Sequence, residues 1–479
     1  MSYRKSPSFQ EVCASSSQTI VPIRQSRREN ILRSRRMIQE PSLTNFSVKV
    51  DMKDLYQISE DLHNNRDVEM CVKKVKYLCH KTGYKCLDAM MDLKIFSDLF
   101  RVLVDPNSSC VTVAFILWIF FNMATINDVY AIYLKKNNIH NICLLYMQST
   151  DLTVRMNSLS LLATFTKVDH FFSLEETVNV FIPKLVSTLN TFKETEMVEA
   201  VATCLEAITR TFVIPLEYLS QLLSLFFLLP NYPDNFLASL SNLVMQKPNH
   251  KTLLSKPNLL ETIASELDGV QSTVSQSALN FLIDVSVLKQ KYAQKLMDQN
   301  VLETVTQAFK ESCRLFDDNK SLSFCNYFIL FGNLCLMGFR AVAVLRSYNI
   351  FSYIFQETTQ PNMFSDTDLP QLIFLFNNAF QMSSEEDKEY LICQQLYYIY
   401  LNYLKLPDVD SNSVTTALIT LKNFMDFSEE NEMGTNHYFI ESGLHDIVEE
   451  LSGNHVKKVS DIASCILGVH GDEDDDDIL

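Results

Sequence analysis

The sequence predicts an all-α protein built as a stack of helical repeats. Gly and Pro together make up 22 of the 479 residues, about 5% against an average usage of roughly 12%, which leaves few residues for the tight turns of a sheet protein. Apolar residues make up 47% of the chain and charged residues 20%, so a large core can be buried. A chain of this length is not expected to form one compact domain, which favours several domains or a repeat array.

Residues 1–50 are expected to form a basic, largely flexible arm. Within residues 1–40, eight basic side chains outnumber three acidic ones, for a net charge of +5, and the remaining residues therefore carry −21. Because phosphate groups are bound by clustered Lys and Arg, the acidity of the body argues against nucleic acid as its main ligand.

The array itself is expected to span residues 51–470, where apolar positions recur at helical spacing. Residues 110–126 carry no charge over 17 positions, near the lower limit for a membrane-spanning helix. Asp105 and Asp128 flank the stretch, without a positive-inside pattern. We therefore expect a buried helix rather than membrane insertion.

One Asn recurs on five of the predicted helices, at Asn122, Asn242, Asn333, Asn378 and Asn423. With three intervening helices in register, the average spacing is about 43 residues, which is typical of two- or three-helix armadillo or HEAT units. Such an Asn ladder can clamp the backbone of an extended peptide through its amides. The alternative is that each Asn caps a neighbouring loop or satisfies one of its carbonyl groups.

Trp118 is the only tryptophan, and it precedes Asn122 by four residues, which places both on one helix face. Its indole offers a flat wall for the stem of a Lys or Arg side chain. The alternative is a core role beside its Phe neighbours.

Four stretches resemble the importin-α family, the armadillo adaptors for nuclear localisation signals. RQSRRENILRSRRM (24–37) resembles the importin-β-binding arm, and residues 54–81 resemble the first repeat. Trp118 to Asn122 occupies the place of the first Trp-x-x-x-Asn pair of the family's groove. Residues 442–477 resemble the last repeat and its acidic tail, which we place at 471–479.

The resemblance implies a right-handed superhelical solenoid of about ten armadillo repeats without a cofactor. It implies an import adaptor that shuttles between cytoplasm and nucleus, with importin-β on the arm, basic cargo signals in the concave groove and an export receptor at the last repeat. The implied cargo residues are Trp118, Asn122, Asn242, Asn333, Phe374, Asn378 and Asn423. The implied arm residues are Arg24, Arg27, Arg28, Arg33, Arg35 and Arg36.

The chain departs from the family at two early pairs, where Ser160/Thr164 and Thr203/Ala207 replace the Trp and the Asn. The later pairs, Ile329/Asn333 and Phe374/Asn378, keep the amide. A lost cation–π wall removes about 0.5–2 kcal/mol of binding free energy. We therefore expect basic signals to depend unusually on the later repeats, or a different class of cargo.

Catalysis and metal binding are not expected. The sequence has no P-loop, Rossmann, HExxH or GxSxG motif. The densest group of potential ligands, Cys71, Cys79, His80 and Cys86, lacks zinc-site spacing. The alternative function is an armadillo scaffold that is not devoted to import, with the arm contacting RNA or a membrane.

Overall fold

The computed structural model describes residues 52–82, 86–168, 171–192, 194–216, 219, 234–246, 250–315, 323–358, 364–407 and 409–468. The predicted arm (1–50) and acidic tail (471–479) lie outside these residues. Every regular element in the described part of the chain is a helix. The chain divides into two compact units, separated after Ser255. We call them the N-terminal unit and the C-terminal unit.

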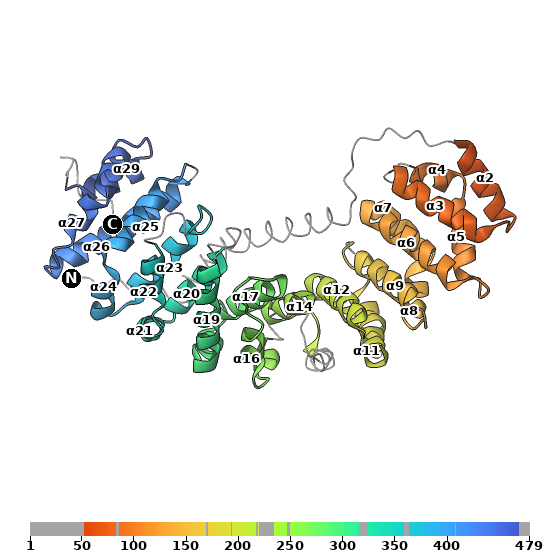
Figure 1. The fold of residues 1–479 in the computed structure, drawn as a ribbon, viewed down its shortest axis with the longest axis horizontal. Coiled ribbons are helices and arrows are strands. Elements are labelled where there is room, and N and C mark those ends of the chain that lie inside the picture. Colours follow the sequence, from red (N-terminus) through yellow and green to blue (C-terminus); the bar gives the residue numbers. More distant parts are fainter. Residues whose placement is uncertain are drawn as a thin grey trace. The chain divides into compact units, whose positions relative to one another are not determined.

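Helices of the N-terminal unit form repeats of up to three helices. They are α2 (Met52–His63), α3 (Val68–Thr82), α4 (Leu87–Asp92), α5 (Ile95–Val104), α6 (Cys110–Ile126), α7 (Asp128–Lys136), α8 (Ile139–Tyr146), α9 (Leu152–Phe165), α10 (Leu174–Glu176), η1 (Thr177–Phe181), α11 (Ile182–Thr191), α12 (Thr195–Thr211), α14 (Asp234–Met245) and α15 (His250–Leu254). The third helices pack in sequence, α3 on α6, α6 on α9, α9 on α12 and α12 on α14 (Figure 1).

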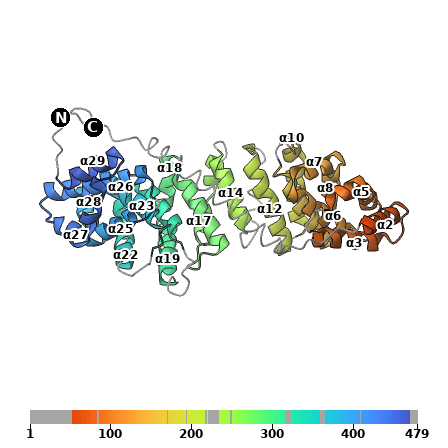
Figure 2. The same cartoon turned by 90° about the horizontal axis from the view of Figure 1, so that it is seen from above.

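The C-terminal unit repeats the same arrangement. Its helices are α16 (Leu259–Ala264), α17 (Thr273–Ser286), α18 (Gln290–Ala293), η2 (Gln294–Met297), α19 (Gln299–Leu315), α20 (Cys325–Cys335), α21 (Phe339–Ser347), α22 (Ile350–Glu357), α23 (Leu369–Met382), α24 (Glu385–Leu391), α25 (Gln394–Leu404), α26 (Ser411–Glu430), α27 (Asn436–Glu441), α28 (Leu444–Ser452) and α29 (Lys457–Ile466). Here the third helices α17, α20, α23, α26 and α29 pack each on the next (Figure 1), and Figure 2 shows α17, α23, α26 and α29 from above.

Helix α6 corresponds to the uncharged stretch 110–126 and confirms that this stretch is a buried helix. The Ser109 side chain caps its first turn by accepting a hydrogen bond from the Thr112 backbone N–H at 3.2 Å. The helix packs between α3 and α9, and Ile116, Leu117 and Phe120 are wholly buried. Among the described residues, no helix combines the length and the apolar character needed to cross a bilayer.

A left-handed residue forms the corner between the first and second helices of five repeats. These corners are Lys94, Asn138, Asn258, Asn349 and Gly443, with φ between 56° and 79°, and they lie directly before α5, α8, α16, α22 and α28. Only Gly, and to a lesser degree Asn, adopts this conformation without strain. Asn therefore takes a position that Gly usually fills, which is consistent with the low Gly content.

Replacing Lys94 by Gly is expected to stabilise the N-terminal unit by about 1 kcal/mol, because a side chain in the left-handed region is strained. Urea unfolding followed by circular dichroism measures the change in midpoint. Lys74→Gly is the matched control, since Lys74 is an exposed lysine inside α3 where Gly costs about 1 kcal/mol. An equal loss of stability in the Lys94→Gly and Lys74→Gly variants would contradict the left-handed conformation of Lys94.

Candidate binding surface on the third helices

The predicted pair Trp118 and Asn122 lies on α6, and both side chains are half-buried. The Asn122 amide Nδ2 donates to the Trp118 carbonyl oxygen at 2.7 Å. One of the two amide N–H groups is therefore used within the helix itself. The pair is adjacent, as the four-residue spacing predicts.

Lys76 of α3 lies over the aromatic rings of α6. Its Nζ is 4.1 Å from the centre of the Phe115 ring and 4.9 Å from that of the Trp118 ring, within the range of cation–π attraction. Partial burial lowers the pKa of the Lys76 ammonium group. The sequence analysis assigned the position over Trp118 to a lysine or arginine of the cargo. In the structure, Lys76 of the chain itself occupies that position.

A hollow of about 280 Å³ lies between the two helices. We call it the α3/α6 hollow. It is lined by Lys73, Lys76, Tyr77 and His80 from α3 and by Phe115 and Trp118 from α6. None of them carries a negative charge. The sequence analysis missed the α3 side, although positions 73, 76, 77 and 80 follow the spacing of one helix face.

Three of the other predicted Asn side chains donate to the third helix of the preceding repeat. The bonds run from Asn242 Nδ2 to Thr209 Oγ1 at 3.2 Å, from Asn333 Nδ2 to Ser286 Oγ at 2.9 Å, and from Asn378 Nδ2 to the Gly332 carbonyl oxygen at 3.2 Å.

Burial separates these Asn residues further. Asn333 is 2% exposed and Asn378 is 7% exposed, whereas Asn423 on α26 is exposed. Asn333 and Asn378 therefore hold neighbouring helices, and neither donates to a loop carbonyl as the alternative expects. Their role as peptide clamps stays a prediction.

The later aromatic wall, Phe374, is half-buried on α23 against a glycine of α20. A Cβ added to Gly332 would lie 2.6 Å from the Phe374 ring. The close packing of α20 on α23 therefore depends on the absence of a side chain at this position.

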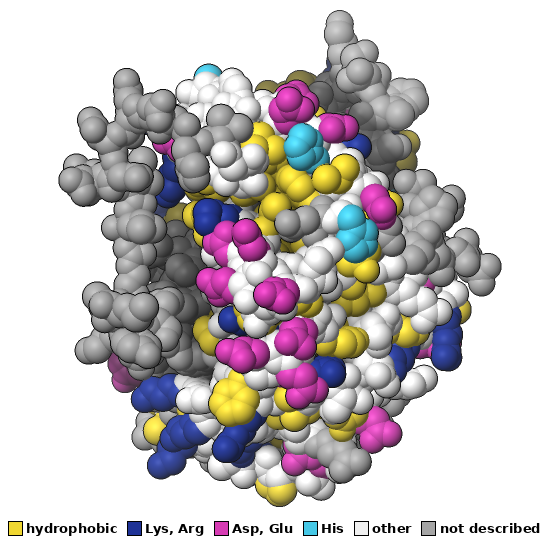
Figure 3. Space-filling model, turned by 90° about the vertical axis from the view of Figure 1, so that its left-hand side faces the viewer, with side chains coloured by type: hydrophobic (Ala, Val, Ile, Leu, Met, Phe, Trp, Pro, Cys, Tyr) yellow, Lys and Arg dark blue, Asp and Glu magenta, His cyan; other side chains and the backbone are white. Residues whose placement is uncertain are grey.

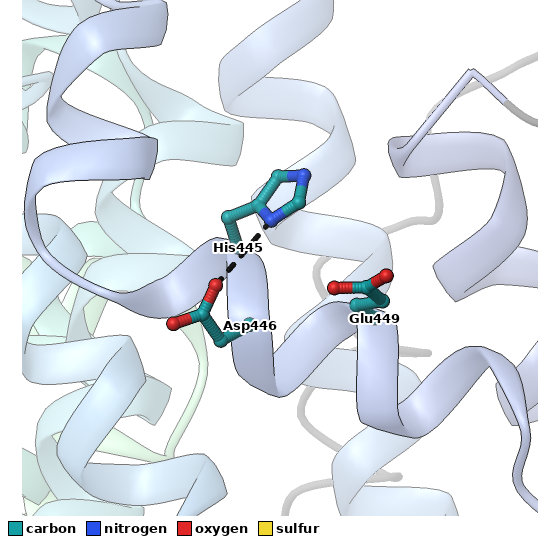
Figure 4. A group of neighbouring side chains, drawn as sticks. All are labelled: His445, Asp446 and Glu449. Carbon is teal, nitrogen blue, oxygen red and sulfur yellow. Dashed lines mark ion pairs between the residues drawn. The ribbon is translucent and has the colours of Figure 1, made fainter.

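Candidate metal ligands in the described residues do not form a built site. Cys79 and Cys86 are buried, and each sulfur lies 4.0 Å from the sulfur of Met90. His445, Asp446 and Glu449 stand close together on α28 (Figure 4), but Asp446 and Glu449 are exposed. We assign no ligand to either group.

The end of the C-terminal unit presents apolar side chains beside histidines (Figure 3). Ile440 of α27, in the last part of this unit, is 65% exposed. The export receptor implied by the resemblance would dock on this last repeat, and that docking stays a prediction.

Comparisons with known proteins identify the fold. No protein-family model and no curated protein sequence matches the chain. The solved structure of an engineered protein is similar, with a TM-score of 0.62 and 13% identity over 87% of this chain and 98% of that one. The fold is an armadillo-like stack of helical repeats.

Another similar solved structure comes from work on a phosphorylation switch that controls the interaction between cadherin and β-catenin. It matches with a TM-score of 0.44 and 11% identity, covering 87% of this chain and 95% of that chain. These likenesses concern the fold alone, and membership of the importin-α family stays a proposal.

Asn378→Ala is expected to destabilise the C-terminal unit by about 1–2 kcal/mol, because it leaves the buried Gly332 carbonyl without this donor. Asn423→Ala is the matched control, expected to change stability by less than about 0.5 kcal/mol because its side chain is exposed. Urea midpoints measure both variants. Similar effects from the two would rule out the inter-repeat bond as a stabilising contact.

Proposed function

We propose that this chain is a helical-repeat adaptor that carries protein cargo into the nucleus. Importin-β would bind the arm, and cargo would bind the surface of the third helices. The observation that carries the proposal is the unbroken row of third helices in each unit, because stacked repeats create extended surfaces for partner proteins. Shuttling between cytoplasm and nucleus, with an export receptor at the last repeat, belongs to the same proposal.

Support for importin-β as the partner comes from the sequence of the arm, since residues 24–37 lie outside the described residues. Two basic clusters, Arg27–Arg28 and Arg35–Arg36, are separated by a short spacer. Such a segment suits folding upon an acidic partner, with charge steering the encounter.

Basic cargo signals would avoid the α3/α6 hollow. A second cation about 5 Å from the Lys76 ammonium would be repelled by about 1–3 kcal/mol at effective dielectric constants between those of water and of a protein surface. In the same unit, α12 exposes Glu196 and Glu199, which attract Lys and Arg side chains. We therefore place basic signals on α12 and on the later repeats.

The second candidate is an armadillo scaffold that is not devoted to import. It is favoured by Asn333 and Asn378, whose amides hold neighbouring repeats together. A scaffold of this kind requires the stacked repeats but does not require the arginines of the arm.

Arg27/Arg28→Ala in the full-length chain is expected to reduce capture of purified importin-β by at least about tenfold, since two charge-assisted contacts are lost. A pull-down with equal amounts of each protein measures this, together with nuclear accumulation of a fluorescent fusion.

Arg4/Lys5→Ala is the matched control, because it removes the same charge from the arm outside the two clusters. It is expected to leave capture nearly unchanged. If the unmodified chain does not capture importin-β, the import function is wrong and the scaffold remains.

A further inference from the structure

We infer that the α3/α6 hollow is a recognition site for an acidic peptide segment of a partner protein. The inference does not rest on import, because it concerns α3 and α6 and not the arm. It also differs from the basic cargo that the resemblance implies.

The charged side chains that line the hollow are the two lysines, Lys73 and Lys76. Lys73, Lys76 and His80 line it from one face of α3. Helix α6 has no charged residue along its whole length. The acidic residue of α3, Glu69, pairs with Lys73 at 2.7 Å, and both side chains are about half exposed, so the pair is weak and easily exchanged. A ligand carboxylate would therefore meet positive groups on one wall and neutral rings on the other.

Lys76 is the cation that would bind the carboxylate of the ligand. The two rings hold its ammonium group in place, and no carboxylate pairs with it among the described residues. Its pKa is lowered by partial loss of hydration, which a bound anion would offset because an opposite charge favours the protonated form. The cation is thus positioned before a ligand arrives, which reduces the ordering cost of binding.

The negative charge of the body favours a peptide over a nucleic acid as the source of the anion. The Tyr77 side chain is 60% exposed, and with Phe115 and Trp118 it offers apolar surface to residues that flank an acid. A nucleic acid would extend its phosphates beyond the hollow over a body whose net charge is −21, where they would be repelled. A short acidic segment confines its charge to the hollow.

Trp118 allows a direct test, because it is the chain's only tryptophan and lines the hollow. Its emission is measured in the full-length protein during titration with a short peptide in which Asp and Glu flank one Leu. Matched peptides carry Lys or Ser in place of the acids. The acidic peptide is expected to change the emission saturably, and the other two are not.

Two lysine variants separate the site from general electrostatics. Lys76→Gln is expected to weaken binding of the acidic peptide about tenfold, since one charge-assisted contact is lost, and Lys76→Arg is expected to retain most of it. Lys74→Gln is the matched control, because Lys74 is an exposed lysine of the same helix outside the lining. It is expected to weaken binding less than about twofold, and circular dichroism checks that every variant is folded.

Three results would overturn the inference. They are the absence of a saturable change in Trp118 emission with the acidic peptide, an equal loss of binding in the Lys76→Gln and Lys74→Gln variants, and a saturable change in Trp118 emission at lower concentrations of the basic peptide or of a short single-stranded oligonucleotide. None of these results bears on importin-β capture, so the two proposals fail independently.

Discussion

The packing of each third helix between two others is the constraint on which the rest of the structure depends. Helix α6 carries no charged residue and is apolar over most of its circumference, and Ile116, Leu117 and Phe120 are wholly buried between its neighbours. Burial of each such side chain contributes about 1.5–3 kcal/mol. One neighbour cannot cover a helix of this kind, so a row of third helices forms in which every inner member has two partners.

A row of buried helices must also satisfy the polar groups that it encloses. Asn333 and Asn378 do this by donating to the preceding third helix. Asp368, at the start of α23, is wholly buried and accepts hydrogen bonds from the backbone N–H groups of Phe324 and Cys325 at 2.8 and 2.9 Å. It therefore caps α20 from the following repeat. These bonds fix how one repeat lies on the next, because a shifted repeat would leave buried groups unpaired.

The sequence predicts the fold class well because both of its signals are local. Helical spacing is set within each helix, and each of the five recurring Asn residues lies on the third helix of its repeat in the structure. The left-handed corners at Asn138, Asn258 and Asn349 are local too. The sequence analysis missed them because Asn also occurs at helix starts and on exposed faces, as at Asn423.

The environment of each predicted site residue could not be predicted in the same way. Asn333 and Asn423 share one pattern, yet the first is buried and the second exposed. The difference comes from side chains of neighbouring repeats, about forty residues away along the chain. The Ser286 hydroxyl accepts the hydrogen bond from Asn333. The periodicity of the sequence does not predict such a pair.

The role of Trp118 also depends on a residue about forty positions away along the chain. The local sequence around an aromatic ring does not show whether the ring binds a cation of a ligand or a cation of the chain itself. Lys76, one repeat earlier, makes the difference, because it places a positive charge of α3 over the Trp118 ring. Further along the same unit, Glu196 and Glu199 of α12 present the opposite charge. One row of third helices thus carries exposed side chains of opposite charge, lysines on α3 and glutamates on α12.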